Sequence, residues 1–266
     1  MMNNKLKIAV LGLGEAGSHF ANDLVNLGVE VVGFDPKPIH QLNEAISVKT
    51  SNAEAVQNAD VIFSANLSSV SEDIANELVN ALKPHQFFCE MNTSGPEKKL
   101  KIASILKPSG VKMIDLAIMA PVPPKGMMTP LLASGEFAFE FSEKQKPLNL
   151  DLSVLKNSKI GDAATRKLLR SIVYKGIAAV VCEAMEAGKS FGMESYIRSQ
   201  ISSLIGGNQD LIDRFVEGSR THATRRMHEM DAVIEMLEAQ GIEPIVTKGT
   251  RNNLEKLSLV SSKYAV

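Results

Sequence analysis

The stretch KIAVLGLGEAGSHFANDLVNLG, residues 7–28, joins an apolar run, three closely spaced glycines and an amphipathic segment. The apolar run predicts a buried β-strand over 7–14, and the spacing of the apolar residues that follow predicts a helix over 15–27. Gly12, Gly14 and Gly17 form the pattern GxGxxG between them. At such a turn the first glycine permits a tight bend, the second lets the backbone approach a phosphate, and the third lets helix and strand pack closely. The sequence therefore predicts a strand, a phosphate-binding turn and a helix.

An acidic residue ends the next predicted strand, EVVGFD (30–35). Asp35 follows the glycines by about 20 residues, where a carboxylate accepts hydrogen bonds from the ribose hydroxyls of an adenine dinucleotide. With the glycine turn it predicts a dinucleotide site, to which Glu15 and Ala16 of the helix also contribute. A carboxylate repels a 2′-phosphate, so NAD is favoured over NADP. Lys37, two residues later, keeps NADP as an alternative.

The first 118 residues alternate short apolar runs with amphipathic segments. Further strands are expected at 59–66, 86–92 and 111–118, and further helices at 38–47, 70–82 and 96–107. This alternation is typical of a Rossmann-type, doubly wound parallel sheet in the α/β class. Asn66 and Leu67, at the end of one predicted strand, are assigned to the same cofactor site. From Asp162 to about Gly241 the pattern is helical, so an α/β domain over 1–160 and an all-α domain over 161–266 are expected.

The composition argues against several classes of protein. The 29 basic and 30 acidic side chains leave a net charge of −1, which provides no basic surface for nucleic acid. No run of about 18 uncharged apolar residues is present, so no membrane span is expected. Glycines interrupt the first apolar run, which argues against a signal peptide. Both cysteines, Cys89 and Cys182, lie in apolar runs, and the histidines show no metal-ligand spacing. We expect a cytoplasmic protein without disulfides or a bound metal.

Two further segments carry organisational information. MAPVPPKGMMTP (119–130) contains four prolines and cannot form a regular helix or a central strand, so a functional or connecting loop is expected. In the helical half, residues 176–182 are apolar on nearly all sides. A helix without a polar face must be covered all round. A second subunit is the simplest cover, and a homodimer through the helical domain is therefore expected.

Three stretches resemble the β-hydroxyacid dehydrogenase and 6-phosphogluconate dehydrogenase superfamily. They are IAVLGLGEAGSHFANDLVNLG (8–28), EMNTSGPEKK (90–99) and DLAIMAP (115–121). The first resembles the family's strand, glycine turn and helix, and the second its segment beside the nicotinamide, which implies that Asn92 and Thr93 border that ring. The resemblance implies an oxidoreductase that transfers hydride between NAD(P) and a small hydroxy acid of the β-hydroxyacid or sugar-acid type.

The third stretch stands where the family carries its substrate loop. Met119, Ala120 and Pro121 occupy the positions of a serine and two glycines that hold a substrate carboxylate in the family. Proline has no amide hydrogen to donate, so the usual carboxylate contacts are altered, although the amides of Met119 and Ala120 remain candidates. An alternative is that this loop is only a stiff connection between domains.

The segment GDAATRKLLRSIVYKG (161–176) resembles the start of the family's interdomain helix, which carries the catalytic lysine. The resemblance places Lys167 in that role. A lysine partly removed from water has a lowered pKa and can take the hydroxyl proton as hydride leaves the carbon. Ser171 stands where the family has an asparagine that orients the substrate. Lys175, eight residues after Lys167 and near the same helix face, is the second candidate.

The segment THATRRMHEMDAVIEMLEAQGIEP (221–244) resembles the C-terminal domain of a phosphogluconate-dehydrogenase-like subgroup. On a helix, His222, Arg225, Arg226 and Glu229 share one polar face because they recur at intervals of three and four. Guanidinium groups bind carboxylates and phosphates well. The candidate substrate residues here are His222, Arg225 and Arg226, with Ser171 and Lys175 on the interdomain helix. An ordinary ladder of surface ion pairs is the alternative.

Two other functions remain open from the sequence. The altered substrate loop is compatible with an imine-reducing or decarboxylating enzyme on the same fold. The loss of the family's serine, glycine and asparagine is also compatible with a dinucleotide-binding regulator without turnover. A small-molecule acid substrate remains the favoured partner.

Overall fold

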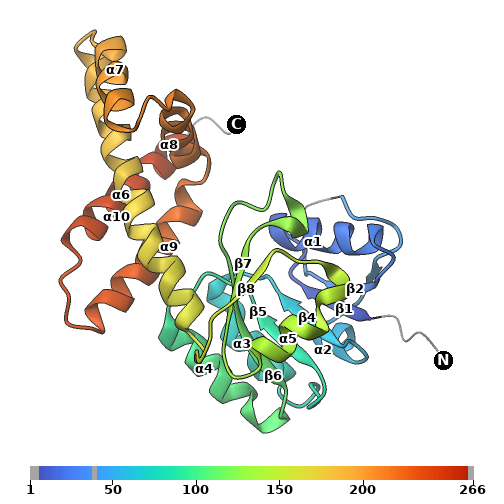
Figure 1. Ribbon diagram of the computed structural model, residues 1–266. Helices are drawn as coiled ribbons and strands as arrows, with labels where there is room; N and C mark the ends of the chain where they lie inside the picture. The colour runs from blue at the N-terminus through green and yellow to red at the C-terminus, as the bar shows by residue number, and fades with distance from the viewer. Residues whose placement is uncertain (1–5, 38–40, 263–266) are drawn as a thin grey trace. The chain divides into compact units, whose positions relative to one another are not determined.

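The computed structural model describes residues 6–37 and 41–262 and divides into two compact units, Met1–Lys167 and Leu168–Val266 (Figure 1). The first unit contains all the strands of the described residues, and the second is built from helices. The domain boundary expected after residue 160 immediately precedes the long helix α6 (Asp162–Ser190), whereas the compact units divide within that helix. Each unit is described below by itself.

One eight-stranded sheet forms the centre of the first unit, with the order β3-β2-β1-β4-β5-β6-β7-β8. All neighbouring strands are parallel except β6 and β7, which pair antiparallel. This arrangement confirms the predicted doubly wound α/β fold. The strands are β1 (Lys7–Leu11), β2 (Glu30–Phe34), β3 (Ser47–Val48), β4 (Val61–Ser64), β5 (Phe87–Glu90), β6 (Lys112–Ile118), β7 (Leu131–Ser134) and β8 (Leu152–Val154).

Alternate side chains of the central strands enter two separate apolar cores. Ile8 and Val10 of β1 belong to one cluster, and Ala9 and Leu11 to the other, as the two-residue period of a strand requires. The first cluster is covered by α1 (Glu15–Asn26) and α5 (Ala138–Lys144), and the second by α2 (Asn52–Val56), α3 (Ser71–Leu78) and α4 (Pro96–Leu106). Helices on both faces leave the strand ends as the accessible edge of the sheet.

The helix predicted over 38–47 is wrong for the residues that the structure describes. Residues 38–40 lie outside them, and 41–46 form no helix before β3 begins at Ser47. Asparagine side chains take the hydrogen bonds that a helix would need. Asn22 Oδ1 accepts from the Asn43 amide at 2.9 Å, and Asn43 Oδ1 accepts from the Ala45 amide at 3.0 Å. Such local side-chain bonds compete with helix formation.

The end of the sheet also differs from the expectation. The last strand, β8, ends at Val154, and residues 155–161 form a connection that contains turns and no strand. Asn157 and Gly161 have positive φ angles of 51° and 97°, which a strand does not accommodate. The short β7 was not expected because four residues between Pro130 and Gly135 carry too little pattern to be recognised.

The second unit comprises the rest of α6 with α7 (Glu194–Leu204), α8 (Gln209–Thr221), α9 (Ala223–Glu238) and α10 (Ile245–Ser262). Two small cores hold it together. Leu168 of α6 packs with Met230 and Val233 of α9, and Val181 of α6 packs with Phe215 of α8. None of the helices described is long and apolar enough to cross a membrane.

Candidate active site

The glycine turn lies at the carboxyl end of β1, between β2 on one side and β4 on the other. Chain connections leave β1 in opposite directions at this point, and such switch points form ligand sites in open α/β sheets. Gly12 has a φ of +88°, and a Cβ there would lie 2.6 Å from the Ala65 carbonyl oxygen. A Cβ at Gly17 would lie 1.8 Å from the Gly12 oxygen, whereas a Cβ at Gly14 meets nothing within 4 Å. Gly12 thus serves the tight turn and Gly17 the close packing of helix and strand. Gly14 leaves the backbone open to the approach of a ligand.

The positive end of helix α1 faces the same edge of the sheet. Gly14 is its N-cap and provides no side-chain cap, so first-turn amides such as those of Ala16 and Gly17 have no acceptor within the helix. Amides in this position, together with the helix dipole, bind phosphate groups. The turn and helix start therefore fit the pyrophosphate of a dinucleotide.

Asp35 is held in place by two backbone amides. Its Oδ2 accepts from the Leu13 amide at 2.8 Å, and its Oδ1 accepts from the Lys37 amide at 2.8 Å. The first bond ties the carboxylate directly to the glycine turn. Each carboxylate oxygen has a further lone pair for a ribose hydroxyl. Residues 38–40, which follow Lys37 in the sequence, lie outside the described part of the chain.

The ends of β4 and β5 continue the site along the sheet edge. Asn66 Nδ2 donates to Ser64 Oγ at 3.0 Å, and Leu67 is 72% exposed. Ser68 and Ser94 share a hydrogen bond of 2.8 Å between their hydroxyl oxygens, which joins the loops that follow the two strands. The structure therefore brings the segments of Asn66 and Leu67 beside the segment after β5.

Asn92 presents a buried hydrogen-bond acceptor. Its Nδ2 donates to Glu90 Oε1 at 2.5 Å, which fixes the orientation of the amide. The opposite atom, Oδ1, is buried and has no hydrogen-bond partner. Leaving a buried polar atom unpaired is costly, so a donor from a ligand would be favoured there. A carboxamide N–H fits this position, in agreement with the placement of Asn92 beside a nicotinamide.

The adjacent residue, Thr93, receives the side chain of Lys167. Lys167 Nζ donates to Thr93 Oγ1 at 2.7 Å, although 74 residues separate them in the sequence. Lys167 lies in the second turn of α6, and its side chain is partly buried. The structure thus brings together two residues that the family resemblance nominated, one from the nicotinamide segment and one from the interdomain helix.

The proline-rich segment is folded against the first unit. Val122, Met127 and Thr129 are buried, and the Met127 amide donates to Asp23 Oδ2 of α1 at 2.9 Å. The Met119 amide donates to the Pro130 carbonyl oxygen at 2.8 Å and is therefore committed to the β6–β7 pair. Since Pro121 has no amide hydrogen, a ligand carboxylate at this segment would use the amide of Ala120. Ala120 and Met119 are partly exposed, and Pro121 is exposed.

A second group of polar side chains lies within the helical unit. Lys175 Nζ, on α6, donates to Ser171 Oγ at 3.0 Å and to Glu229 Oε2 of α9 at 2.6 Å. Burial lowers the pKa of the Lys175 ammonium; Glu229 opposes this shift, and the positive charges of Arg226 and Arg225 add to it. The structure therefore unites the predicted residues of α6 with those of α9.

The arginines of α9 differ in their surroundings. Arg226 donates to Ser219 Oγ at 2.9 Å and lies 5.7 Å from the centre of the Tyr174 ring, a cation–π distance. Arg225 is exposed, and His222 is partly buried at the junction of α8 and α9, one residue before the helix that was expected to contain it. Lys175 and Glu229 form an ion pair of 2.6 Å within this cluster.

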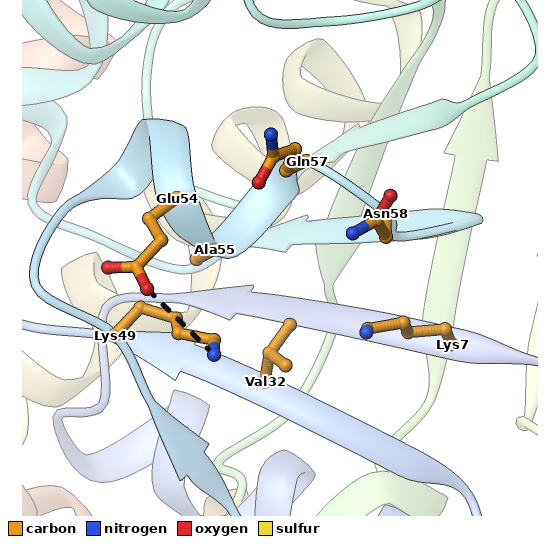
Figure 2. A pocket seen from close by; sticks show the side chains of 7 residues that line it. All are labelled: Lys7, Val32, Lys49, Glu54, Ala55, Gln57 and Asn58. Atoms are coloured by element: carbon orange, nitrogen blue, oxygen red, sulfur yellow. Dashed lines mark ion pairs between the residues drawn. The ribbon is translucent and has the colours of Figure 1, made fainter.

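One hollow lies away from all these residues, beside α2 and the first two strands (Figure 2). Its lysines already have acidic partners: Lys7 pairs with Glu30 at 2.6 Å and Lys49 with Glu54 at 3.9 Å. The hollow contains none of the residues that the sequence nominated, and we assign it no role.

Sequence reasoning missed a buried charged group beside the site, formed by Glu90, Lys99 and Asp115. Asp115 offered a signal, because an acidic residue inside the apolar strand KMIDLAI is unusual. Lys99 offered none, since it stands among other lysines in EKKLK, a run typical of a solvated helix face.

Comparisons with known proteins agree with this geometry. Residues 7–122 match the family model of the NAD binding domain of 6-phosphogluconate dehydrogenase, and residues 189–257 match that of a domain of unknown function. An uncharacterized 28.5 kDa protein of Methanothermus fervidus is 26% identical over 253 residues, which cover 93% of this chain and 97% of that protein. The 2-(hydroxymethyl)glutarate dehydrogenase of Eubacterium barkeri is 24% identical over 233 residues, which cover 81% of this chain and 74% of that protein.

A solved structure of a conserved protein of unknown function, described as structurally similar to 3-hydroxyacid dehydrogenases, has a TM-score of 0.73. It is 27% identical and covers 95% of this chain and 96% of its own. The fold and the glycine turn thus define an NAD(P)-binding Rossmann protein. Within that class the chain is similar to the β-hydroxyacid dehydrogenase and 6-phosphogluconate dehydrogenase superfamily, in agreement with the resemblance seen in the sequence.

Proposed function

We propose that the protein is an NAD-dependent oxidoreductase that interconverts a small hydroxy acid and its carbonyl form, with Lys167 as general acid and base. The observation that carries this proposal is the hydrogen bond of 2.7 Å between Lys167 Nζ and Thr93 Oγ1, beside the unpaired Oδ1 of Asn92. It supports a proton-transferring amine at the edge where the nicotinamide segment ends.

The proposed chemistry divides the work between cofactor and protein. A nicotinamide held at this edge would supply the hydride acceptor for oxidation and, in its reduced form, the hydride donor for reduction. Lys167, as the neutral amine, accepts the proton of the alcohol oxygen as the C=O bond forms, and as the ammonium returns it in the reverse direction. Thr93 orients the amine through its hydroxyl, and Asn92 Oδ1 would accept a hydrogen bond from the carboxamide of a bound nicotinamide. Charge and protons balance without a metal ion as co-reactant.

The proposal includes NAD as the preferred cofactor. Asp35 is fixed beside the glycine turn by the Leu13 and Lys37 amides, so its charge lies close to where the ribose binds. A carboxylate accepts hydrogen bonds from two ribose hydroxyls, whereas it repels a 2′-phosphate. Lys37 contributes its backbone amide to this arrangement, which supports NAD rather than NADP.

The substrate is proposed to carry an acidic group, with Ser171 and Lys175 of α6 as candidate residues for binding it. Lys167, Ser171 and Lys175 recur every four residues along α6, and therefore share one helix face. The substrate named for the Eubacterium barkeri relative, 2-(hydroxymethyl)glutarate, is a hydroxy acid with two carboxylates, which supports this class of substrate.

A combined binding and turnover assay tests the proposed function. Thermal-shift titrations with NAD, NADH, NADP and NADPH are expected to give the largest rise in Tm with NADH. A ligand at 100 times its Kd stabilises the folded protein by about 2.7 kcal/mol, so the rise is measurable. Branched hydroxy acids with one or two carboxylates, added with NAD, should then give a steady rise in NADH absorbance. Shifts with dinucleotides but no turnover with any acid would support the regulator instead. Carbon dioxide among the products would identify a decarboxylating variant. Turnover of imines alone would identify an imine reductase. The absence of any Tm shift with the four dinucleotides would contradict the proposal.

We also propose that the protein is a homodimer through its helical unit. Four large apolar side chains form a stripe on α6 at intervals of four, four and three residues: Leu169, Val173, Ile177 and Val180, which are 48%, 61%, 44% and 68% exposed. Such a stripe on one helix face is typical of a surface that a partner covers. Within one chain the segment 176–182 is therefore covered only in part, as Ala178 and Val181 are buried.

Placing a charge in this stripe should weaken the dimer. Val180→Glu is expected to convert the dimer to monomer at micromolar concentration, because a carboxylate at a buried interface position loses its hydration without a partner. Sedimentation velocity measures the change. Lys189→Glu, which alters an exposed charge on the opposite side of the same helix, should leave the dimer intact. A wild-type monomer, or equal behaviour of the two variants, would contradict this interface.

A further inference from the structure

Three charged side chains are buried together between β5, α4 and β6. Glu90 and Lys99 are 1% exposed and Asp115 is 0% exposed, and the strand register places Glu90 directly opposite Asp115. Lys99 Nζ contacts the Glu90 carboxylate, donates to the Glu90 carbonyl oxygen at 3.0 Å and lies 3.3 Å from Asp115 Oδ1. Burial alone would lower the pKa of Lys99, but the two carboxylates together raise it. One ammonium thus serves two adjacent carboxylates.

The remaining negative charge is balanced by the start of helix α6. Asp115 Oδ2 accepts from the amides of Gly161 at 3.1 Å and Ala164 at 3.0 Å. Ser134 Oγ donates to the same oxygen at 3.1 Å and accepts from the Ala163 amide at 3.0 Å. A helix N-terminus carries a partial positive charge and unpaired amides. The Asp115 carboxylate is attracted to this charge and accepts hydrogen bonds from these amides. The helix that carries Lys167 therefore begins on a side chain held by Lys99.

The other carboxylate holds the opposite side of the site. Glu90 Oε1 accepts from Asn92 Nδ2 at 2.5 Å, and the next residue, Thr93, accepts from Lys167. The contacts consequently form a closed circuit from Asn92 through Glu90, Lys99 and Asp115 to α6, and back through Lys167 to Thr93. All of it lies within the first unit.

We infer that Lys99 is a positioning residue, which fixes the Asn92 amide and the first turn of α6 relative to each other and thereby sets the place of the Lys167 amine. The inference rests on the proposed role of Lys167. Without Lys99 the carboxylates of Glu90 and Asp115 repel each other in an environment that excludes water, and breaking a buried ion pair by removing one partner is strongly unfavourable. Either the two strand ends separate or one carboxylate takes a proton.

Two variants separate positioning from folding. Lys99→Met leaves two buried carboxylates and is expected to lower Tm strongly. The double variant Lys99→Met with Glu90→Gln removes one positive and one negative charge, so it should recover most of that loss while still lacking the link between Asn92 and α6. Lys101→Met, an exposed lysine of the same helix that pairs with Glu72, is the matched control.

Hydrogen exchange and lysine labelling measure the outcome without any substrate. In the double variant, the amides of residues 161–167 should exchange about tenfold faster, and the rate at which acetic anhydride labels Lys167 should change. With a substrate in hand, kcat should fall about tenfold while KM for NADH changes less than about twofold. Lys101→Met should match the wild type in each measurement.

A folded double variant with wild-type exchange and labelling would overturn the inference. Should the double variant fail to fold, Ser134→Ala provides the test, because it deletes one hydroxyl and no charge from the contacts that begin α6. It should accelerate exchange over residues 161–167, and unchanged exchange would again overturn the inference. If Lys167→Ala retains full turnover, the proposed function fails, whereas exchange and labelling still decide whether Lys99 positions Lys167.

Discussion

Replacing Lys167 with alanine is expected to lower kcat by about a hundredfold or more and to leave the Kd for NADH within about twofold. The physical reason is the position of its amine, which lies 2.7 Å from Thr93 Oγ1 beside the buried amide of Asn92. Removing the amine deletes the group proposed to take the hydroxyl proton but leaves the glycine turn and Asp35 intact. Steady-state turnover and NADH fluorescence titration measure the two quantities separately.

Charge-preserving and neighbouring variants make this test specific. Lys167→Arg keeps the positive charge, but a guanidinium does not release its proton, so it should be about as inactive as the alanine variant. Arg166→Ala, on the exposed side of the same helix, should retain wild-type kcat. Activity in Lys167→Arg would assign the residue an electrostatic role, and undiminished kcat in Lys167→Ala would remove it from the mechanism.

Lys175 should respond differently from Lys167. Its ammonium is held by Ser171 and Glu229 within the helical unit, and these contacts suit a binding group rather than a freely moving amine. The sequence left both lysines open because they stand eight residues apart on one helix face. Contacts with residues far away in the sequence, Thr93 for one and Glu229 for the other, distinguish them.

Most of the fold could be predicted because local patterns agree with the tertiary structure. The glycine turn, the apolar strands and the amphipathic helices each indicate a parallel α/β sheet, and β1, β2, β4, β5 and β6 formed where they were expected. The helix prediction failed over residues 41–46 because asparagine side chains take the place of the backbone hydrogen bonds of a helix. The pattern of apolar residues does not reveal such side-chain bonds. The antiparallel strand β7 was not predicted because its four residues are too few to show a periodic pattern.

The site could be predicted where a residue type has a fixed chemical task. Glycines at a turn and a carboxylate at a strand end belong to that group, whereas Lys167 was nominated by the family resemblance. The buried contacts of Lys99 could not be predicted, because whether a lysine in a charged run faces water or a pair of carboxylates depends on the packing of α4 against β5 and β6. Likewise, the use of the Met119 amide by Pro130 follows from the antiparallel turn that the sequence did not show.

Gly17→Ala is expected to destabilise the first unit by about 3 kcal/mol or more and to abolish dinucleotide binding. Its added Cβ would lie 1.8 Å from the Gly12 carbonyl oxygen and 2.9 Å from the Gly12 carbonyl carbon. Both are backbone atoms of the turn, which cannot move aside as a flexible side chain can. Helix α1 would have to shift away from β1, and the phosphate-binding amides would shift with it. Thermal unfolding with and without NADH measures both effects.

Gly14→Ala is the matched control, since the same methyl group is added three residues earlier. A Cβ at Gly14 meets no atom within 4 Å, and its φ of −68° suits alanine, so Tm without ligand should stay near that of the wild type. The methyl group would nevertheless stand where a pyrophosphate approaches the backbone, so the stabilisation by NADH should shrink. Full NADH stabilisation in Gly14→Ala would place the pyrophosphate elsewhere. A stable, NADH-binding Gly17→Ala would contradict the close packing of helix and turn on which the cofactor site depends.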